Sequence, residues 1–210
     1  MDIFGPQWRD HCARMATAWD ACVGAEDIVL SPGDISWAMR LDEAGADLAW
    51  LGARPGLKVL CRGNHDYWWS SIGKVRAALP AGCIALQNDA AVLGDVVVVG
   101  SRCWVAPGGL DYKPEDEKIY VRELQRLRMS LEHGRNIGDG RPTIAAIHYP
   151  PFRADGQATQ ITELLEEFGV ALCVYGHLHG VRAHRTAVEG LVRGIQYRLI
   201  ASDYLDFRPV

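Results

Sequence analysis

The residues best suited to chemistry lie in four short segments rich in aspartate, asparagine and histidine. The segments are Gly33-Asp34, Gly63-Asn64-His65-Asp66, His148 and Gly176-His177-Leu178-His179. Their carboxylate and amide oxygens and imidazole nitrogens suit Mn, Fe, Zn or Co better than a metal that prefers thiolates. Residues two apart in an extended segment face the same side, so His177 and His179 can both face one site. We therefore predict a divalent metal centre built from these side chains.

Each of the four segments follows a short apolar run of the kind that forms buried strands. The runs cover residues 28–30, 57–61, 144–147 and 171–175. Ligands in open α/β sheets bind beyond the carboxyl ends of the strands, so the four segments are expected to converge on one site. The glycines permit the tight turns and close backbone approach that such a site needs.

The rest of the chain alternates between helical and strand-like patterns. Apolar residues at three- and four-residue steps predict helices over residues 8–23, 37–51, 120–131 and 161–168. Further strand-like runs cover residues 84–86, 96–99 and 197–201. This order predicts an α/β fold of layered sheets flanked by helices. No linker or repeat divides the sequence, so residues 1–210 are expected to form one domain.

The composition excludes several classes of protein. Hydrophobic residues at 49% and charged residues at 23% are typical of a globular domain and not of a disordered chain. A net charge of −4 leaves no basic surplus for nucleic acid, and an anionic substrate would need positive charge from another source. The six scattered cysteines form no CxxC pair, which favours reduced thiols. The sequence has neither a signal peptide nor an apolar span of about 18 residues, so we expect a cytoplasmic protein without a membrane partner.

The order GD, GNHD, H and GHxH resembles the motifs of the calcineurin-like metallophosphoesterases over essentially the whole chain. The contexts 1–6 (MDIFGP), 148–151 (HYPP) and 201–205 (ASDYL) are similar to a bacterial branch of that family whose substrate is unknown. The resemblance implies a four-layer α-β-β-α sandwich. It also implies hydrolysis of a phosphate mono- or diester by a metal-activated water, with a small phosphorylated substrate.

The resemblance also implies roles for the metal-ligating residues. Asp34 would bridge two metal ions, and His179 would belong to the first of them. Asn64, His148 and His177 would complete the shell of the second ion. Two divalent ions would clamp a phosphoryl group and supply the positive charge that this acidic chain lacks.

The GNHD motif supplies the expected catalytic residues by the same resemblance. His65 would be the acid that protonates the leaving group, and Asp66 would orient His65. Asn64 would help to stabilise the charge that develops on the phosphoryl group.

One motif of the family is missing. The family places DxH on its first strand, and no such tripeptide precedes Asp34; Asp10 and His11 are adjacent and lie on a predicted helix. We expect that the chain starts internally and lacks its first strand, and evolved loss of the motif is the alternative. With only Asp34 and His179, the first metal would have too few ligands, so one ion is the expectation for this chain as it stands.

Two other functions stay open. The chain is a single-metal phosphate-binding or interaction module if the incomplete site no longer supports catalysis. A nuclease of the same superfamily is disfavoured, because the sequence has no basic clusters for nucleic acid.

Several residues near the motifs have a structural interpretation as well as a functional one. Tyr67, Trp68 and Trp69 follow GNHD and would stack a base or line a pocket mouth, although core packing is favoured. Arg62 would contact phosphate or form a structural ion pair. The remaining histidines, which fall on helical or surface-like stretches, are expected to have no role in the site: His11, His133 and His184.

Overall fold

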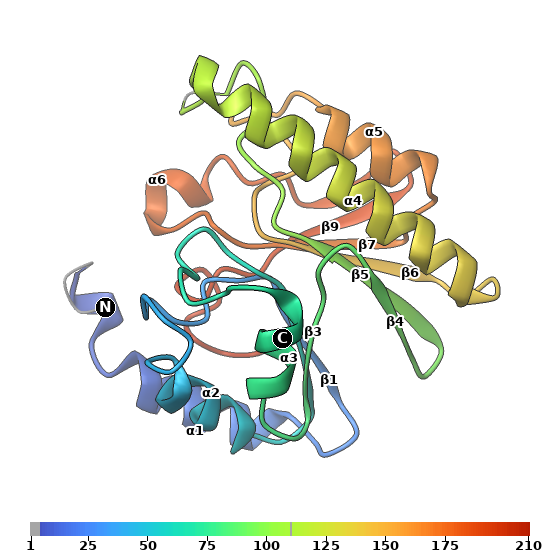
Figure 1. Cartoon of the computed structure of the whole chain (residues 1–210). Helices are drawn as coiled ribbons and strands as arrows, with labels where there is room; N and C mark the ends of the chain where they lie inside the picture. Colours follow the sequence, from blue (N-terminus) through green and yellow to red (C-terminus); the bar gives the residue numbers. More distant parts are fainter. Residues whose placement is uncertain (1–4, 110) are drawn as a thin grey trace.

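The computed structural model describes residues 5–109 and 111–210, and it contains two sheets (Figure 1). The first sheet is parallel, with the order β1 (Ile28–Ser31), β2 (Leu57–Leu60) and β3 (Cys83–Ala85). The second sheet has six strands in the order β4-β5-β6-β7-β9-β8. Its strands are β4 (Ala90–Leu93), β5 (Val96–Ser101), β6 (Thr143–Ile147), β7 (Leu172–Tyr175), β8 (Gly190–Val192) and β9 (Ile195–Leu199). The edge strands β4 and β8 run antiparallel to their neighbours, and β5, β6, β7 and β9 are parallel.

Helices occupy most of the connections between strands. They are α1 (His11–Cys22), α2 (Gly45–Gly52), α3 (Ile72–Ala78), α4 (Glu117–Gly138), α5 (Gln160–Glu167) and α6 (Gly180–His184), with the 3-10 turns η2 (Pro6–Trp8) and η3 (Pro114–Asp116). The structure has a helix in each of the four predicted places, and three of them begin near the predicted residue. No helix within the described parts of the chain has the length and hydropathy needed to cross a membrane.

The helix predicted over residues 37–51 begins later than expected, at Gly45. The Glu43 carboxylate accepts hydrogen bonds from the amides of Met39 and Arg40, and the Ser36 hydroxyl accepts one from the amide of Ala38. Side chains that bind nearby amides in this way compete with helical hydrogen bonding. The apolar periodicity therefore extends beyond the segment whose backbone is helical.

Three apolar clusters define the layers of the molecule. The inner faces of the two sheets meet through Val59 and Cys61 on one side and Val98, Ala146 and Val174 on the other. Within β6, Ala146 belongs to this inner cluster while its neighbours Ala145 and Ile147 belong to the cluster under the helices. Such alternation is expected of a strand buried on both faces.

The outer faces of both sheets are covered by helices. Trp19 of α1, Leu48 of α2 and Val75 of α3 pack with Leu60 of the first sheet. Leu127 of α4 and other residues of α4 and α5 cover the second sheet. Figure 1 shows α1, α2 and α3 on one side of the molecule and α4 and α5 on the other. The predicted four-layer α-β-β-α sandwich is confirmed.

The strand β1 pairs on one side only within the described residues, with β2. Its other edge has no strand partner among residues 5–109 and 111–210. The expectation that a further strand belongs to this domain stays a prediction.

Candidate metal centre

The structure brings four of the predicted metal ligands together, two from each sheet. Asp34 follows β1, Asn64 follows β2, His148 follows β6 and His177 follows β7. The oxygen Oδ1 of Asn64 lies 2.7 Å from Nε2 of His148 and 3.0 Å from Nδ1 of His177. The same Nε2 lies 3.2 Å from Nδ1 of His177 and 3.5 Å from Oδ2 of Asp34. We call these four residues the donor cluster.

The protonation of the donor cluster fits a cation at its centre. Nδ1 of His148 lies 3.2 Å from the carbonyl oxygen of Pro32, which can only accept a hydrogen bond, so the ring proton belongs on Nδ1. The lone pair of Nε2 then faces the oxygens of Asn64 and Asp34, and all three atoms are acceptors. Acceptors that face one another are satisfied by a positive ion.

Burial keeps both imidazoles neutral, the form that binds metals. It lowers the pKa of His148 well below the usual value. Burial, reinforced by the nearby His179, lowers the pKa of His177 to about 4.

The amide of Asn64 adds a fourth donor to the donor cluster. Within the described residues, no group of three or more His, Cys, Asp and Glu side chains is arranged to hold a metal ion. Donors held at about 2.0–2.2 Å from one ion lie about 3.3–3.6 Å apart at tetrahedral angles and about 2.8–3.1 Å apart at right angles. The separations of 2.7 to 3.5 Å in the donor cluster therefore suit a divalent ion bound by two imidazoles, one amide and one carboxylate.

Unusual backbone conformations place these side chains. Asp34 and His177 have φ values of 57° and 69°, a region that costs a residue with a side chain about 1–3 kcal/mol. Two glycines allow the loops after β1 and β2 to touch. A Cβ on Gly63 would lie 2.0 Å from Oδ1 of Asp34, and one on Gly33 would lie 2.4 Å from the amide nitrogen of Gly63. Glycine at both positions is therefore required for Asp34 to enter the donor cluster.

The structure corrects the role predicted for Asp66. Its carboxylate accepts hydrogen bonds from the amides of four residues and from the indole of Trp68, all at 2.7 to 3.1 Å. The four amides belong to Gly63, Asp34, Ile35 and Ser36. Asp66 is fully buried, and no described hydrogen bond joins it to the ring of His65. Asp66 fastens the loop after β1 to the loop after β2 and does not orient His65.

The ring of His65 is held by two aromatic neighbours that sequence reasoning did not assign to it. Trp37 stacks on it with ring centroids 4.5 Å apart, and the hydroxyl of Tyr67 lies 3.1 Å from Nδ1. Tyr67 is exposed, whereas Trp68 and Trp69 are buried. Core packing, the favoured interpretation for all three aromatic residues, is right for the two tryptophans and wrong for Tyr67.

His179 makes its described contacts outside the donor cluster. Its Nδ1 lies 2.7 Å from Oδ1 of Asp203, and Oδ2 of Asp203 accepts a hydrogen bond from the amide of Gly180. The ring of Trp8 lies against His179, with centroids 5.6 Å apart. His184, predicted to have no role, also approaches Asp203, at 3.4 Å. Sequence reasoning noted the segment that contains Asp203 but gave Asp203 no role.

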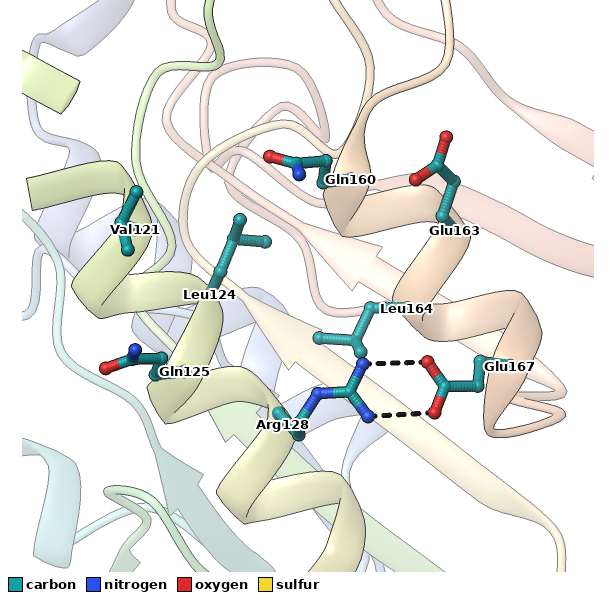
Figure 2. A pocket seen from close by; sticks show the side chains of 8 residues that line it. All are labelled: Val121, Leu124, Gln125, Arg128, Gln160, Glu163, Leu164 and Glu167. Atoms are coloured by element: carbon teal, nitrogen blue, oxygen red, sulfur yellow. Dashed lines mark hydrogen bonds and ion pairs between the residues drawn. The ribbon is translucent and has the colours of Figure 1, made fainter.

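The structure has a hollow elsewhere, between α4 and α5 (Figure 2). It is lined by apolar residues such as Val121 and Leu124 and by charged ones. Figure 2 shows Arg128 and Glu167 paired through two hydrogen bonds across it. None of the predicted site residues lines this hollow, so the donor cluster remains the candidate site.

Comparison with known proteins places the chain in a family. A sequence model described as calcineurin-like phosphoesterase matches residues 7–181. The chain belongs to the calcineurin-like phosphoesterase family. Members of this family are in general metal-dependent hydrolases of phosphoesters, and they bind divalent metal ions.

Two curated relatives of this calcineurin-like phosphoesterase come from mycobacterial phages. The chain is 46% identical over 57 residues to "Gene 66 protein" of Mycobacterium phage L5, which is 27% of each chain. It is 47% identical over 65 residues to "Gene 66 protein" of Mycobacterium phage D29, which is 31% of each chain. The matches thus span less than a third of the length of these relatives.

Proposed function

We propose that this protein hydrolyses a phosphate mono- or diester of a small molecule in a metal-dependent reaction. The observation that carries the proposal is the donor cluster, in which acceptors from the ends of four strands face one another. A divalent ion bound by Asp34, Asn64, His148 and His177 would hold the phosphoryl oxygens and lower the pKa of an attacking water. Mn, Fe, Zn and Co all suit this donor set.

The chain's own residues supply the proton for the leaving group. His65 lies in the loop that carries Asn64, and its amide donates a hydrogen bond to Oδ1 of Asp34 at 2.8 Å. Because Nδ1 of His65 is paired with Tyr67, Nε2 is the ring nitrogen left to protonate the leaving oxygen. Tyr67 and Trp37 act by fixing the direction of the imidazole.

Removal of metal ions tests the proposal directly. Protein treated with a chelator and dialysed is expected to hydrolyse neither p-nitrophenyl phosphate nor bis(p-nitrophenyl) phosphate, and added Mn²⁺ is expected to restore hydrolysis of at least one. Release of p-nitrophenol measures the rate, and elemental analysis measures bound metal. Full activity in the metal-free protein would contradict the proposal.

The same experiment distinguishes the phosphoesterase from the second candidate function, a single-metal phosphate-binding or interaction module. The sequence has no DxH motif before Asp34, and the described hydrogen bond of His179 runs to Asp203 and not to the donor cluster, so one ion rather than two stays the expectation at this centre. Bound metal without turnover of either ester would support the module.

Replacing Tyr67 by phenylalanine tests the acid role of His65. We expect kcat to fall by about tenfold for an alkyl phosphate, since general acid catalysis contributes about 10²–10⁴-fold and only its orientation is lost. The effect should be small for p-nitrophenyl phosphate, whose leaving group departs without a proton. Tyr112→Phe, which removes a hydroxyl that binds Glu117 instead, is the matched control. Equal losses on both esters would argue against positioning of His65 by Tyr67.

A cytoplasmic location is part of the proposal. It is supported by the six cysteines, all of which are free in the structure. The net charge of −4 supports a small phosphorylated substrate rather than nucleic acid.

A further inference from the structure

Three arginines surround one buried carboxylate beside the donor cluster. Glu123 of α4 is 2% exposed, and its Oε1 accepts hydrogen bonds from Arg102 at 2.9 Å and from Arg126 at 2.8 Å. Arg122 approaches the same oxygen at 3.5 Å. The side chain of Arg102 is only 13% exposed, and its guanidinium lies over the ring of Trp104. One negative charge is therefore shared by three positive ones.

Arg62 adds a further cation to this group. Among the described residues, no carboxylate or carbonyl accepts a hydrogen bond from its guanidinium, and its Nε is buried without a partner. The end of β5, which carries Arg102, lies against the segment that carries Arg62, since a Cβ on Gly100 would lie 2.4 Å from Sγ of Cys61. The carboxylates of Asp66 and Glu123 are already bound to other donors. An anion is the partner that this group of cations lacks.

The arginines lie at the same edge of the sheets as the donor cluster. Arg62 directly precedes Gly63 and Asn64. Arg102 follows β5, and its carbonyl accepts a hydrogen bond from the amide of Tyr149, the neighbour of His148. We call Arg62, Arg102 and Arg126 the arginine cluster.

We propose that the arginine cluster is a subsite for a second oxyanion of the substrate, next to the scissile phosphoryl group. This inference rests on the proposed phosphoesterase activity and names its substrate class: phosphate esters that carry a further carboxylate or phosphate. The planar guanidinium donates two parallel hydrogen bonds to either oxyanion, which lysine cannot do. Arg126 and Arg102 neutralise Glu123, and Arg62 is left to bind the substrate.

Three esters with the same carbon chain test the inference. They are the phosphate monoesters of propanol and of 3-hydroxypropanoate, and the bisphosphate of 1,3-propanediol. We expect kcat/KM for at least one of the two esters with a second anion to exceed that of propyl phosphate by about tenfold or more, as charge-assisted hydrogen bonds predict. Comparison of these two esters tells whether carboxylate or phosphate is preferred.

Substitutions test whether a preference for esters with a second anion depends on the arginine cluster. Arg62→Gln should remove the preference for esters with a second anion. Arg102→Gln removes one of the cations that neutralise the buried Glu123 carboxylate, and this variant could fail to fold. The double variant Arg102→Gln with Glu123→Gln removes that negative charge as well, so it tests Arg102 without a buried unpaired carboxylate. Arg128→Gln, which removes an arginine of α4 that pairs with Glu167, is the control and should keep the preference.

The outcomes separate this inference from the proposed function. Equal kcat/KM for the three esters, or a preference that survives Arg62→Gln, would overturn the subsite and leave the phosphoesterase intact. If none of the esters is hydrolysed, calorimetric titration of the metal-free protein with inorganic phosphate measures anion binding and tests the subsite instead. The subsite predicts binding that Arg62→Gln weakens and Arg128→Gln does not, and absence of that difference refutes it.

Discussion

Replacing His148 by alanine is expected to weaken divalent metal binding by more than about 100-fold, beyond the usual effect of a residue that only supports a ligand. The substitution removes Nε2, the atom that approaches Asn64, Asp34 and His177 together. The side chain of His148 is 2% exposed, and alanine supplies no donor atom in its place. Calorimetric titration with Mn²⁺ measures the affinity, and phosphoester hydrolysis should fall in parallel.

The control for His148→Ala is His133→Ala. His133 lies on α4, is exposed, and accepts a hydrogen bond from the amide of Ala90. This variant should bind Mn²⁺ as the unaltered protein does. Unchanged metal stoichiometry and affinity in His148→Ala would show that the donor cluster does not hold the ion.

Replacing Asp66 by asparagine is expected to lower the free energy of unfolding by about 3 kcal/mol or more, because each buried donor left unpaired costs about 1–3 kcal/mol. An asparagine keeps the shape of the side chain but turns one acceptor oxygen into an NH₂ group. That group would face backbone N–H groups that now donate to Asp66. Urea denaturation of the metal-free protein measures the change without a contribution from metal binding.

Asp66→Asn should also weaken metal binding, although no described hydrogen bond joins the Asp66 carboxylate to a donor atom of the donor cluster. Its carboxylate holds the amide of Asp34, which lies in the donor cluster. Asp155→Asn, an exposed aspartate paired with Arg153, is the control and should alter neither quantity measurably. Normal stability together with normal affinity in Asp66→Asn would refute the fastening role.

The sequence predicted the four donors that meet, because the strand pattern and the residue types point to the same place, but it also included His179, whose described hydrogen bond runs to Asp203. Asp34, Asn64, His148 and His177 each follow an apolar run, and parallel strands bring their carboxyl ends to one edge. Among the α-helices and strands of the described residues, those that escaped prediction are the short strands β4 and β8 and the short helices α3 and α6. Short elements carry too little periodicity to be recognised.

The partners of the side chains were harder to predict. The bonds of Asp66 run to backbone amides, which every residue type supplies, so nothing in the sequence distinguishes them from a bond to His65. Tyr67 and Trp68 are adjacent aromatics, and only the turn after Asn64 decides that one is exposed and the other buried. Asp203 is far along the chain from His179, so their contact depends on the fold.

Because the donor cluster is divided between the two sheets, metal binding is coupled to the packing of one sheet against the other. Each sheet alone contributes only two donors, and between the sheets lies a cluster of side chains such as Val59, Val98 and Val174. An ion held by all four donors would act as a cross-link, so sliding one sheet over the other would cost binding free energy. At a free ion concentration of about 100 times Kd, mass action adds about 2.7 kcal/mol to the stability of the folded state. In this protein the added stability would oppose movement of one sheet relative to the other, and it would not strengthen either sheet by itself.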